Sequence, residues 1–231
     1  MRDRSPLVQL TADVVILTVR EDRLEVLLIR RGKAPFEGML AIPGGYMEAD
    51  ENLWQTAIRE LEEETSLDGM TPHLELVGVY TDPERDPRGQ IASGAWVAMI
   101  PDPPVAKAGG DAAATEWLPV DQALKEPLAF DHKLILQDAV EKARQSLNQS
   151  TAAVSFCRKE FTISELRRVY EAVWGGKLDP GNFHRKVTRI DGFIEPTGET
   201  TTRDGGRPAA LYRAGARRWL PPSIPRPEVS A

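Results

Sequence analysis

The chain has 231 residues, one cysteine and a formal net charge of −6 at pH 7. This length fits one large domain or two small ones. The lone Cys157 excludes an internal disulfide framework. No apolar run approaches the ~18 residues that a membrane helix needs, and the first ten residues lack the apolar core of a signal peptide. We therefore expect a soluble, cytoplasmic protein that does not contact a membrane.

Charge is distributed unevenly along the chain. Residues 151–231 carry 14 basic and 9 acidic side chains, whereas residues 1–150 carry 15 basic and 26 acidic ones. A basic part beside an acidic part suggests that the basic part meets a polyanion. The charge changes sign within the small, polar stretch 146–153. We predict one domain over residues 1–150, a second over 151–220, and an irregular, proline-rich tail over 221–231.

The first 150 residues mix strand and helix patterns. Apolar runs over 14–19 and 24–30 predict two strands around a charged turn, and 74–80 and 91–100 predict two more. A helix is expected over 53–64, with Leu53, Ala57 and Leu61 on one face. A second helix is expected over 131–147, and its predicted inward residues are Leu134, Ile135, Ala139 and Val140.

The C-terminal part carries clear signals for helix ends. Thr162 and Glu165 have the spacing of a capping box, and Gly175-Gly176 ends the helix that follows. Asp179-Pro180 opens another helix and Gly192 stops it. The residues of this second helix expected to face the core are Phe183, Val187 and Ile190. Strands over 193–196 and 210–213 then form a hairpin with a glycine- and threonine-rich tip.

The stretch 45–67 combines a glycine turn with clustered carboxylates. Glu60, Glu63 and Glu64 lie at i, i+3 and i+4, so a helix places all three on one face. Like charges at this spacing repel, and a hard cation such as Mg²⁺ prefers oxygen ligands. A solvated acidic helix face is the alternative explanation. The Gly44-Gly45 pair allows a tight turn into the helix.

This stretch resembles the Nudix box, with eight of its nine fixed positions matched. The resemblance implies an α/β/α sandwich around a mixed sheet and a ligand that contains a nucleoside diphosphate. It also implies Glu60, Glu63 and Glu64 as metal ligands, and as catalytic residues if the protein is hydrolytic. Glu51 and Arg59 would be a supporting pair. Ser66 departs from the family's glycine, which puts hydrolysis in doubt without removing a metal ligand.

The two predicted C-terminal helices and the hairpin fit a winged helix-turn-helix. The outward side chains of the second helix include the candidate DNA contacts Asn182, Arg185, Lys186 and Arg189. In the hairpin tip, Arg203 and Arg207 are placed to meet phosphate or a minor groove, with Arg207 the stronger candidate. A small dimerisation module with an ordinary solvated face is the alternative.

Together the two halves resemble the Nudix-related transcriptional regulator family over about residues 10–215. The phrases that carry this resemblance are RDPRG (85–89), LAFDHK (128–133), FTISELRRVYEAVWG (161–175) and GRPA (206–209). The resemblance implies an α+β protein with a Nudix-like sensor domain and a winged helix-turn-helix domain. It further implies a homodimeric repressor of NAD biosynthesis or salvage genes that binds a palindromic double-stranded DNA operator and is released by ADP-ribose. Candidate contacts to this effector are Arg30, Arg31, Gly45 and Arg88.

The carboxylate cluster keeps a second hypothesis open. An intact metal site would make the chain a Mg²⁺-dependent ADP-ribose pyrophosphatase, either instead of a regulator or in addition to one. The sequence favours the regulator, because a hydrolase alone explains neither the basic C-terminal part nor the glycine-rich hairpin.

Overall fold

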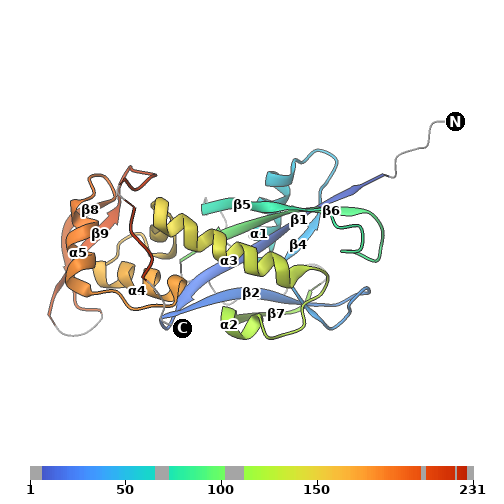
Figure 1. Cartoon of the computed structure of the whole chain (residues 1–231), viewed down its shortest axis with the longest axis horizontal. Helices are drawn as coiled ribbons and strands as arrows, with labels where there is room; N and C mark the ends of the chain where they lie inside the picture. Colours follow the sequence, from blue (N-terminus) through green and yellow to red (C-terminus); the bar gives the residue numbers. More distant parts are fainter. Residues whose placement is uncertain (1–6, 66–72, 102–111, 204–206, 222, 228–231) are drawn as a thin grey trace. The chain divides into compact units, whose positions relative to one another are not determined.

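The structure is a computed structural model, drawn in Figure 1, that describes residues 7–65, 73–101, 112–203, 207–221 and 223–227. The chain divides into two compact units. The first comprises residues 1–17, 25–98 and 103–140, and the second comprises 18–24, 99–102 and 141–231. This division falls inside a long helix, ten residues before the boundary expected at residue 150.

A seven-stranded sheet has the order β3-β2-β1-β6-β5, with β4 paired to β1 and β7 paired to β2. Its long strands β1 (Gln9–Arg20) and β2 (Arg23–Arg31) are the two predicted from apolar runs. β1 is buried over eight consecutive residues, so both of its faces are covered. The other strands are β3 (Leu40–Ala41), β4 (Gly44–Tyr46), β5 (His73–Tyr80), β6 (Ile91–Met99) and β7 (Ala112–Pro119).

Strand β7 was not predicted from the sequence. Its first three residues are alanines, which have a low preference for strands. The strand forms because antiparallel pairing to β2 supplies its partners, with Trp117 opposite Leu27 and Leu118 opposite Val26. Tertiary pairing therefore overrides a weak local signal.

Helix α1 (Leu53–Thr65) follows β4, and helices α2 (Val120–Ala123) and α3 (His132–Gln149) follow β7 in turn. The predicted helix over 53–64 is confirmed as α1. It begins after Asn52, whose side-chain oxygen accepts the backbone N–H groups of Trp54 and Gln55 at 3.0 Å each. Ala57 and Leu61 are buried as expected.

The predicted helix over 131–147 is confirmed as α3, and Figure 1 shows its first half lying across the sheet. Ile135, Ala139 and Val140 are buried, but the expectation for Leu134 was wrong because its side chain is 50% exposed. The buried face of α3 also includes Leu136 and Ala143. Because successive helical residues are rotated by about 100°, Leu134 lies at the edge of this face. None of the helices described is long and apolar enough to cross a membrane.

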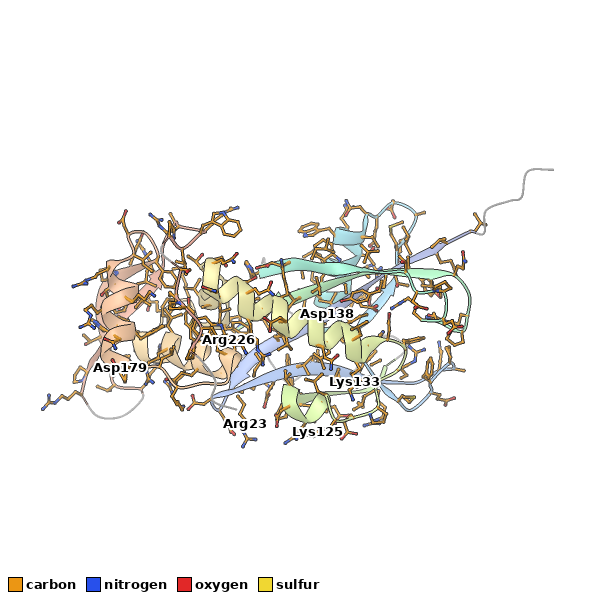
Figure 2. All side chains as sticks on the ribbon, viewed as in Figure 1. Arg23, Lys125, Lys133, Asp138, Asp179 and Arg226 are labelled. Carbon is orange, nitrogen blue, oxygen red and sulfur yellow. The ribbon has the colours of Figure 1, made fainter. Side chains whose placement is uncertain are left out.

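The second unit contains a short 3₁₀ segment, η1 (Ala152–Phe156), and the helices α4 (Ile163–Trp174) and α5 (Pro180–Arg189). The predicted ends of α4 and the predicted start of α5 are confirmed, but α5 ends at Arg189 with Ile190 as its C-cap, before the Gly192 that was expected to stop it. Thr162 and Glu165 form a reciprocal capping box, and Gly175 closes α4 with φ of 74°. The Asp179 side chain, labelled in Figure 2, accepts the Asn182 N–H at 2.7 Å and caps α5.

Large aromatic side chains form the core of this unit. Tyr170 packs edge-on against Trp174 and Phe183, with ring centroids 4.8 and 5.3 Å apart. The predicted inward residues of α5 are buried, including Val187 and Ile190. With one face of α5 fixed in the core, its polar residues are left on the opposite face.

The hairpin is longer than predicted. Strand β8 (Ile194–Thr201) extends five residues past the expected end, and β9 (Ala209–Ala214) pairs with it in antiparallel register. The register shifts between Pro196 and Thr200, next to Gly198 at φ of 86°. The hairpin tip predicted over 197–208 is therefore partly strand.

The described tail residues 221 and 223–227 form neither helix nor strand, yet this part of the chain is docked. Ile224 is buried and donates its backbone N–H to the Asn148 carbonyl at 3.2 Å. Arg226, labelled in Figure 2, lies 3.5 Å from the Glu141 carboxylate. Proline-rich composition predicts irregular backbone but does not predict detachment from the core.

Candidate functional site

A cleft with a volume of about 320 Å³ gathers residues from six separate segments of the first unit. Strand β1, strand β2 with the loop after it, strand β4, helix α1, the loop after β5 and the start of α3 each contribute part of its wall. The charged and aromatic side chains that line it are Asp13, Arg31, Lys33, Tyr46, Glu60, Glu63, Arg85, Asp86, Arg88, Phe130 and His132. Such a mixture of guanidinium groups, carboxylates and rings suits a polar, phosphate-containing ligand.

Glu51 and Arg59, the expected supporting pair, form an ion pair in the structure. The Nε of Arg59 lies 2.8 Å from Glu51 Oε1, and its Nη2 donates to the Tyr46 carbonyl at 3.1 Å. The hydrogen bond from Arg59 lowers the pKa of Glu51 to about 2. Nη1 of the same guanidinium donates to Glu60 at 2.6 Å. One side chain thus links β4 and the loop before α1 to the carboxylates on that helix.

The acidic face of α1 borders the cleft. Glu60 is 8% exposed, and burial raises the pKa of its carboxyl group. Glu63 Oε1 lies 3.5 Å from Arg59 Nη1. The side chain of Glu64 and the whole of Ser66 lie outside the described residues. Among the side chains that are described, no group of three or more histidine, cysteine or acidic residues is arranged to hold a metal ion.

Gly45, an expected ligand contact, lies directly against Glu60. A Cβ at Gly45 would lie 2.8 Å from the carboxyl carbon of Glu60, which is closer than real Cβ contacts come. Only glycine therefore allows β4 and this carboxylate to approach so closely. The half-buried, oxygen-rich wall of Glu60 and Glu63 fits one side of a Mg²⁺ site, since hard cations take carboxylate oxygens.

Two of the three candidate effector arginines lie in the cleft. The guanidinium groups of Arg31 and Arg88 lie 4.7 and 5.3 Å from the centroid of the Phe130 ring. Arg88 also pairs with Asp86, with Nη2 and Oδ2 2.6 Å apart. Phe130 and its T-shaped partner Phe36 both have positive φ, at 55° and 60°. Backbone strain of this kind clusters at ligand sites.

Arg30 does not line the cleft, which corrects the expectation that it meets the same ligand as Arg31. Its Nη1 donates to the Gly38 carbonyl and its Nη2 pairs with Glu116, both at 2.8 Å. Neighbouring residues on a strand point to opposite faces of the sheet. In the structure Arg31 lines the cleft, whereas Arg30 donates to Gly38 and Glu116 outside it.

A largely buried network in the wall of the cleft, made by Asp13, Arg85, Asp131 and His132, was not predicted from the sequence. Arg85 donates to Asp131 at 2.8 Å and to Asp13 at 3.3 Å, and its side chain is 3% exposed. His132 Nδ1 accepts the Ile42 N–H at 2.9 Å, so its proton is on Nε2, 3.8 Å from Asp13 Oδ1. Burial lowers the pKa of His132. The phrases RDPRG and LAFDHK marked two parts of this network.

In the second unit, a groove of about 540 Å³ runs along the exposed face of α5. It is lined by all four of the helix's expected DNA contacts, Asn182, Arg185, Lys186 and Arg189. Arg185 donates to the Asn182 side chain. Burial lowers the pKa of Lys186. A cationic groove on the outer face of a second helix has the electrostatics of a phosphate-binding surface.

The two arginines of the hairpin tip differ. Arg207 is exposed. Arg203 instead binds Glu165, with its Nε 2.9 Å from Oε1, and its Nη2 donates to the Glu160 carbonyl at 3.0 Å. The expectation that Arg203 meets phosphate is therefore corrected, because its donors hold the hairpin to the start of α4.

The fold and the two sites define a class of protein whose chain contains both a cleft suited to a phosphate-containing ligand and a winged helix. A NUDIX domain model matches residues 9–139, and a model of the NrtR DNA-binding winged helix domain matches residues 153–214. The chain belongs to the NUDIX family, in the branch whose members carry the NrtR winged helix.

Three relatives place the chain further. An ADPR responsive transcriptional repressor from Acinetobacter baylyi is 35% identical over 90% of this chain and 82% of its own length. The crystal structure of Shewanella oneidensis NrtR in complex with a 27mer DNA has a TM-score of 0.78 and 31% identity, over 91% of this chain and 97% of that one. An ADP-ribose pyrophosphatase from Methanocaldococcus jannaschii is 39% identical over 49% of this chain and 64% of its own length.

Proposed function

We propose that the chain is a DNA-binding transcriptional repressor that ADP-ribose releases from its operator. The observation that carries the proposal is the groove on α5, where Arg185, Lys186 and Arg189 share the face opposite the buried Phe183 and Val187. A duplex presents a dense row of phosphates to such a face. The Acinetobacter relative, which aligns with 90% of the chain, is an ADPR responsive repressor.

The residues that line the cleft support ADP-ribose as the effector. ADP-ribose carries a pyrophosphate and two ribose groups, and Arg31 and Arg88 offer planar forks to phosphate oxygens. The Phe130 ring beside both guanidinium groups provides a flat face for a ribose or base. A polar cleft with few apolar residues is suited to this ligand rather than to an apolar one.

Fluorescence anisotropy tests the proposal. The probes are labelled promoter duplexes of NAD synthesis and salvage genes from the source organism, with a scrambled duplex as reference. We expect specific binding that weakens steeply with salt and reverses when ADP-ribose is added. Equal affinity for promoter and scrambled duplexes, or promoter binding that ADP-ribose leaves unchanged, would contradict the proposal.

The assembly proposed here is a homodimer on a palindromic operator. A two-fold protein matches a two-fold site, because each winged helix then reads an identical half-site about one DNA turn from the other. Sedimentation velocity should give a dimer mass, and footprinting should give two protected half-sites. A monomer bound to a single half-site would disprove this arrangement.

Hydrolysis of ADP-ribose is the second candidate function. It is favoured by the positions of Glu60 and Glu63, whose side chains line the cleft wall. Together with Glu64 they would hold Mg²⁺, which would polarise the pyrophosphate and lower the pKa of a bound water. AMP release should be assayed with Mg²⁺ for wild type and for Glu63→Gln and Glu64→Gln. Turnover lost in both variants while DNA release persists separates sensing from catalysis.

A further inference from the structure

A short segment after the winged helix, residues 215–217, lies against the turn that ends α5. Gly215 donates its N–H to the Phe193 carbonyl at 2.9 Å, and Arg217 donates its own to the Gly192 carbonyl at 2.8 Å. A Cβ at Gly215 would lie 2.6 Å from the carbonyl carbon of Gly192. The approach of the two backbones therefore requires glycine at 215.

The side chain of Arg217 is held from the same turn. Its Nε donates to the Asp191 carbonyl at 2.6 Å, which fixes the guanidinium group at the C-terminal end of α5. Arg217 lines the same groove as Lys186 and Arg189. Asp191 is the one acidic residue in that lining, against four cationic ones. Within the described part of the chain, none of these four cations has an ion-pair partner.

The segment is also anchored on its other side. Thr151 donates its hydroxyl to the Arg217 carbonyl at 2.9 Å and its N–H to the Arg218 carbonyl at 3.1 Å. Two residues on, Leu220 is buried and donates its N–H to the Gln149 carbonyl at 2.8 Å. Held at both ends, Arg217 loses little conformational freedom when it binds a ligand.

We propose that Arg217 contacts a phosphate of the DNA backbone and forms a phosphate-binding site together with Lys186 and Arg189. The inference rests on the proposed function and extends it beyond residues 153–214, where the winged helix match ends. The guanidinium fork suits phosphate oxygens. Its place at the end of α5, supported by Asp191, suits a positioning contact to the DNA backbone rather than base recognition.

The test compares Arg217→Ala with wild type by anisotropy over a salt series, using a promoter duplex and a scrambled duplex. We expect Arg217→Ala to weaken binding to both duplexes by a similar factor, about tenfold, and to reduce the slope of log K against log salt by about 1. Arg213→Ala is the matched control. Arg213 is exposed on β9, pairs with Glu195 at 3.0 Å and does not line the groove. Its affinity and salt slope should match those of wild type.

The variant Arg217→Gln guards against a folding defect, because it removes the charge and keeps a side-chain donor for the Asp191 carbonyl. It should reproduce the loss of salt slope with an unchanged melting temperature. Wild-type affinity and slope in either folded variant would overturn the role of Arg217 while leaving the repressor intact. Failure of wild type to bind either duplex would instead overturn the proposed function, and this inference with it.

Discussion

Arg203 binds the carboxylate of Glu165 across 38 residues of sequence, and the same carboxylate accepts the backbone N–H of Thr162 at 2.7 Å. The capping box of α4 thereby also fixes the tip of the hairpin. Arg203, which the sequence suggested as a DNA contact, instead holds the hairpin to the start of α4.

Alanine substitutions of the two hairpin-tip arginines should affect different properties, one the stability of the fold and the other the affinity for DNA. Arg203→Ala should lower the free energy of unfolding by about 0.5–1 kcal/mol, the range for a largely solvent-screened pair, and leave DNA affinity near that of wild type. Arg207→Ala should weaken DNA binding and leave the free energy of unfolding near that of wild type. Urea unfolding and anisotropy on the same preparations measure both effects. Equal effects of the two variants on DNA binding would contradict the assignment.

Local sequence rules predicted the helices of the second unit almost to the residue. Thr162, Glu165, Gly175 and Asp179 act within one turn of themselves, so their spacing alone identifies the ends of α4 and the start of α5. The apolar period of α5 likewise predicted its buried face and hence the cationic one. Arg217 was missed because it follows the hairpin and reaches the groove only through tertiary pairing.

The cleft was less predictable. The carboxylates of α1 follow from helical spacing, but Asp13 meets Arg85 from 72 residues away and Ser93 from 80. No local pattern encodes such contacts. Strand alternation predicts opposite faces for Arg30 and Arg31, and only Arg31 lines the cleft in the structure. Leu134 was predicted to be buried because it is apolar and next to Ile135, which does belong to the buried face of α3.

Loss of the Glu51 charge should change the acid stability of the chain. The pKa of Glu51 is held at about 2 by Arg59, so its contribution to stability is present above its ordinary value of 4.5 and disappears as pH falls toward 2. Glu51→Gln should therefore be less stable than wild type at pH 7, and the gap should narrow below pH 4.5. Urea midpoints at pH 7, 4 and 3 measure this. A gap that stays constant with pH would contradict the pairing.

Burial of neutral His132 gives a second pH dependence. Its pKa is lowered by burial, so below about pH 6.5 the unfolded chain binds a proton that the folded chain does not. Stability should fall as pH decreases from 7.5 to 5.5. His132→Gln, which keeps an acceptor for the Ile42 N–H, should remove part of this decrease. An identical pH profile in wild type and variant would show that His132 does not titrate this way.

A methyl group at Gly45 should disturb effector binding selectively. Gly45→Ala places a Cβ against Glu60, so β4 and the carboxylate must separate. We expect the Kd for ADP-ribose to rise about tenfold, equal to 1.4 kcal/mol, with DNA affinity unchanged. Gly78→Ala, whose Cβ meets no atom closer than 3.7 Å, is the control. Calorimetric titration of both variants decides whether the turn is part of the ligand site.

The most direct test of the account follows DNA binding and AMP production together. Labelled promoter duplex and protein are mixed, ADP-ribose is added with and without Mg²⁺, and anisotropy and AMP are recorded from the same sample. We predict that ADP-ribose releases the duplex before AMP accumulates, including without Mg²⁺. Rapid AMP formation by a chain that binds no duplex specifically would contradict the account and make the protein a pyrophosphatase.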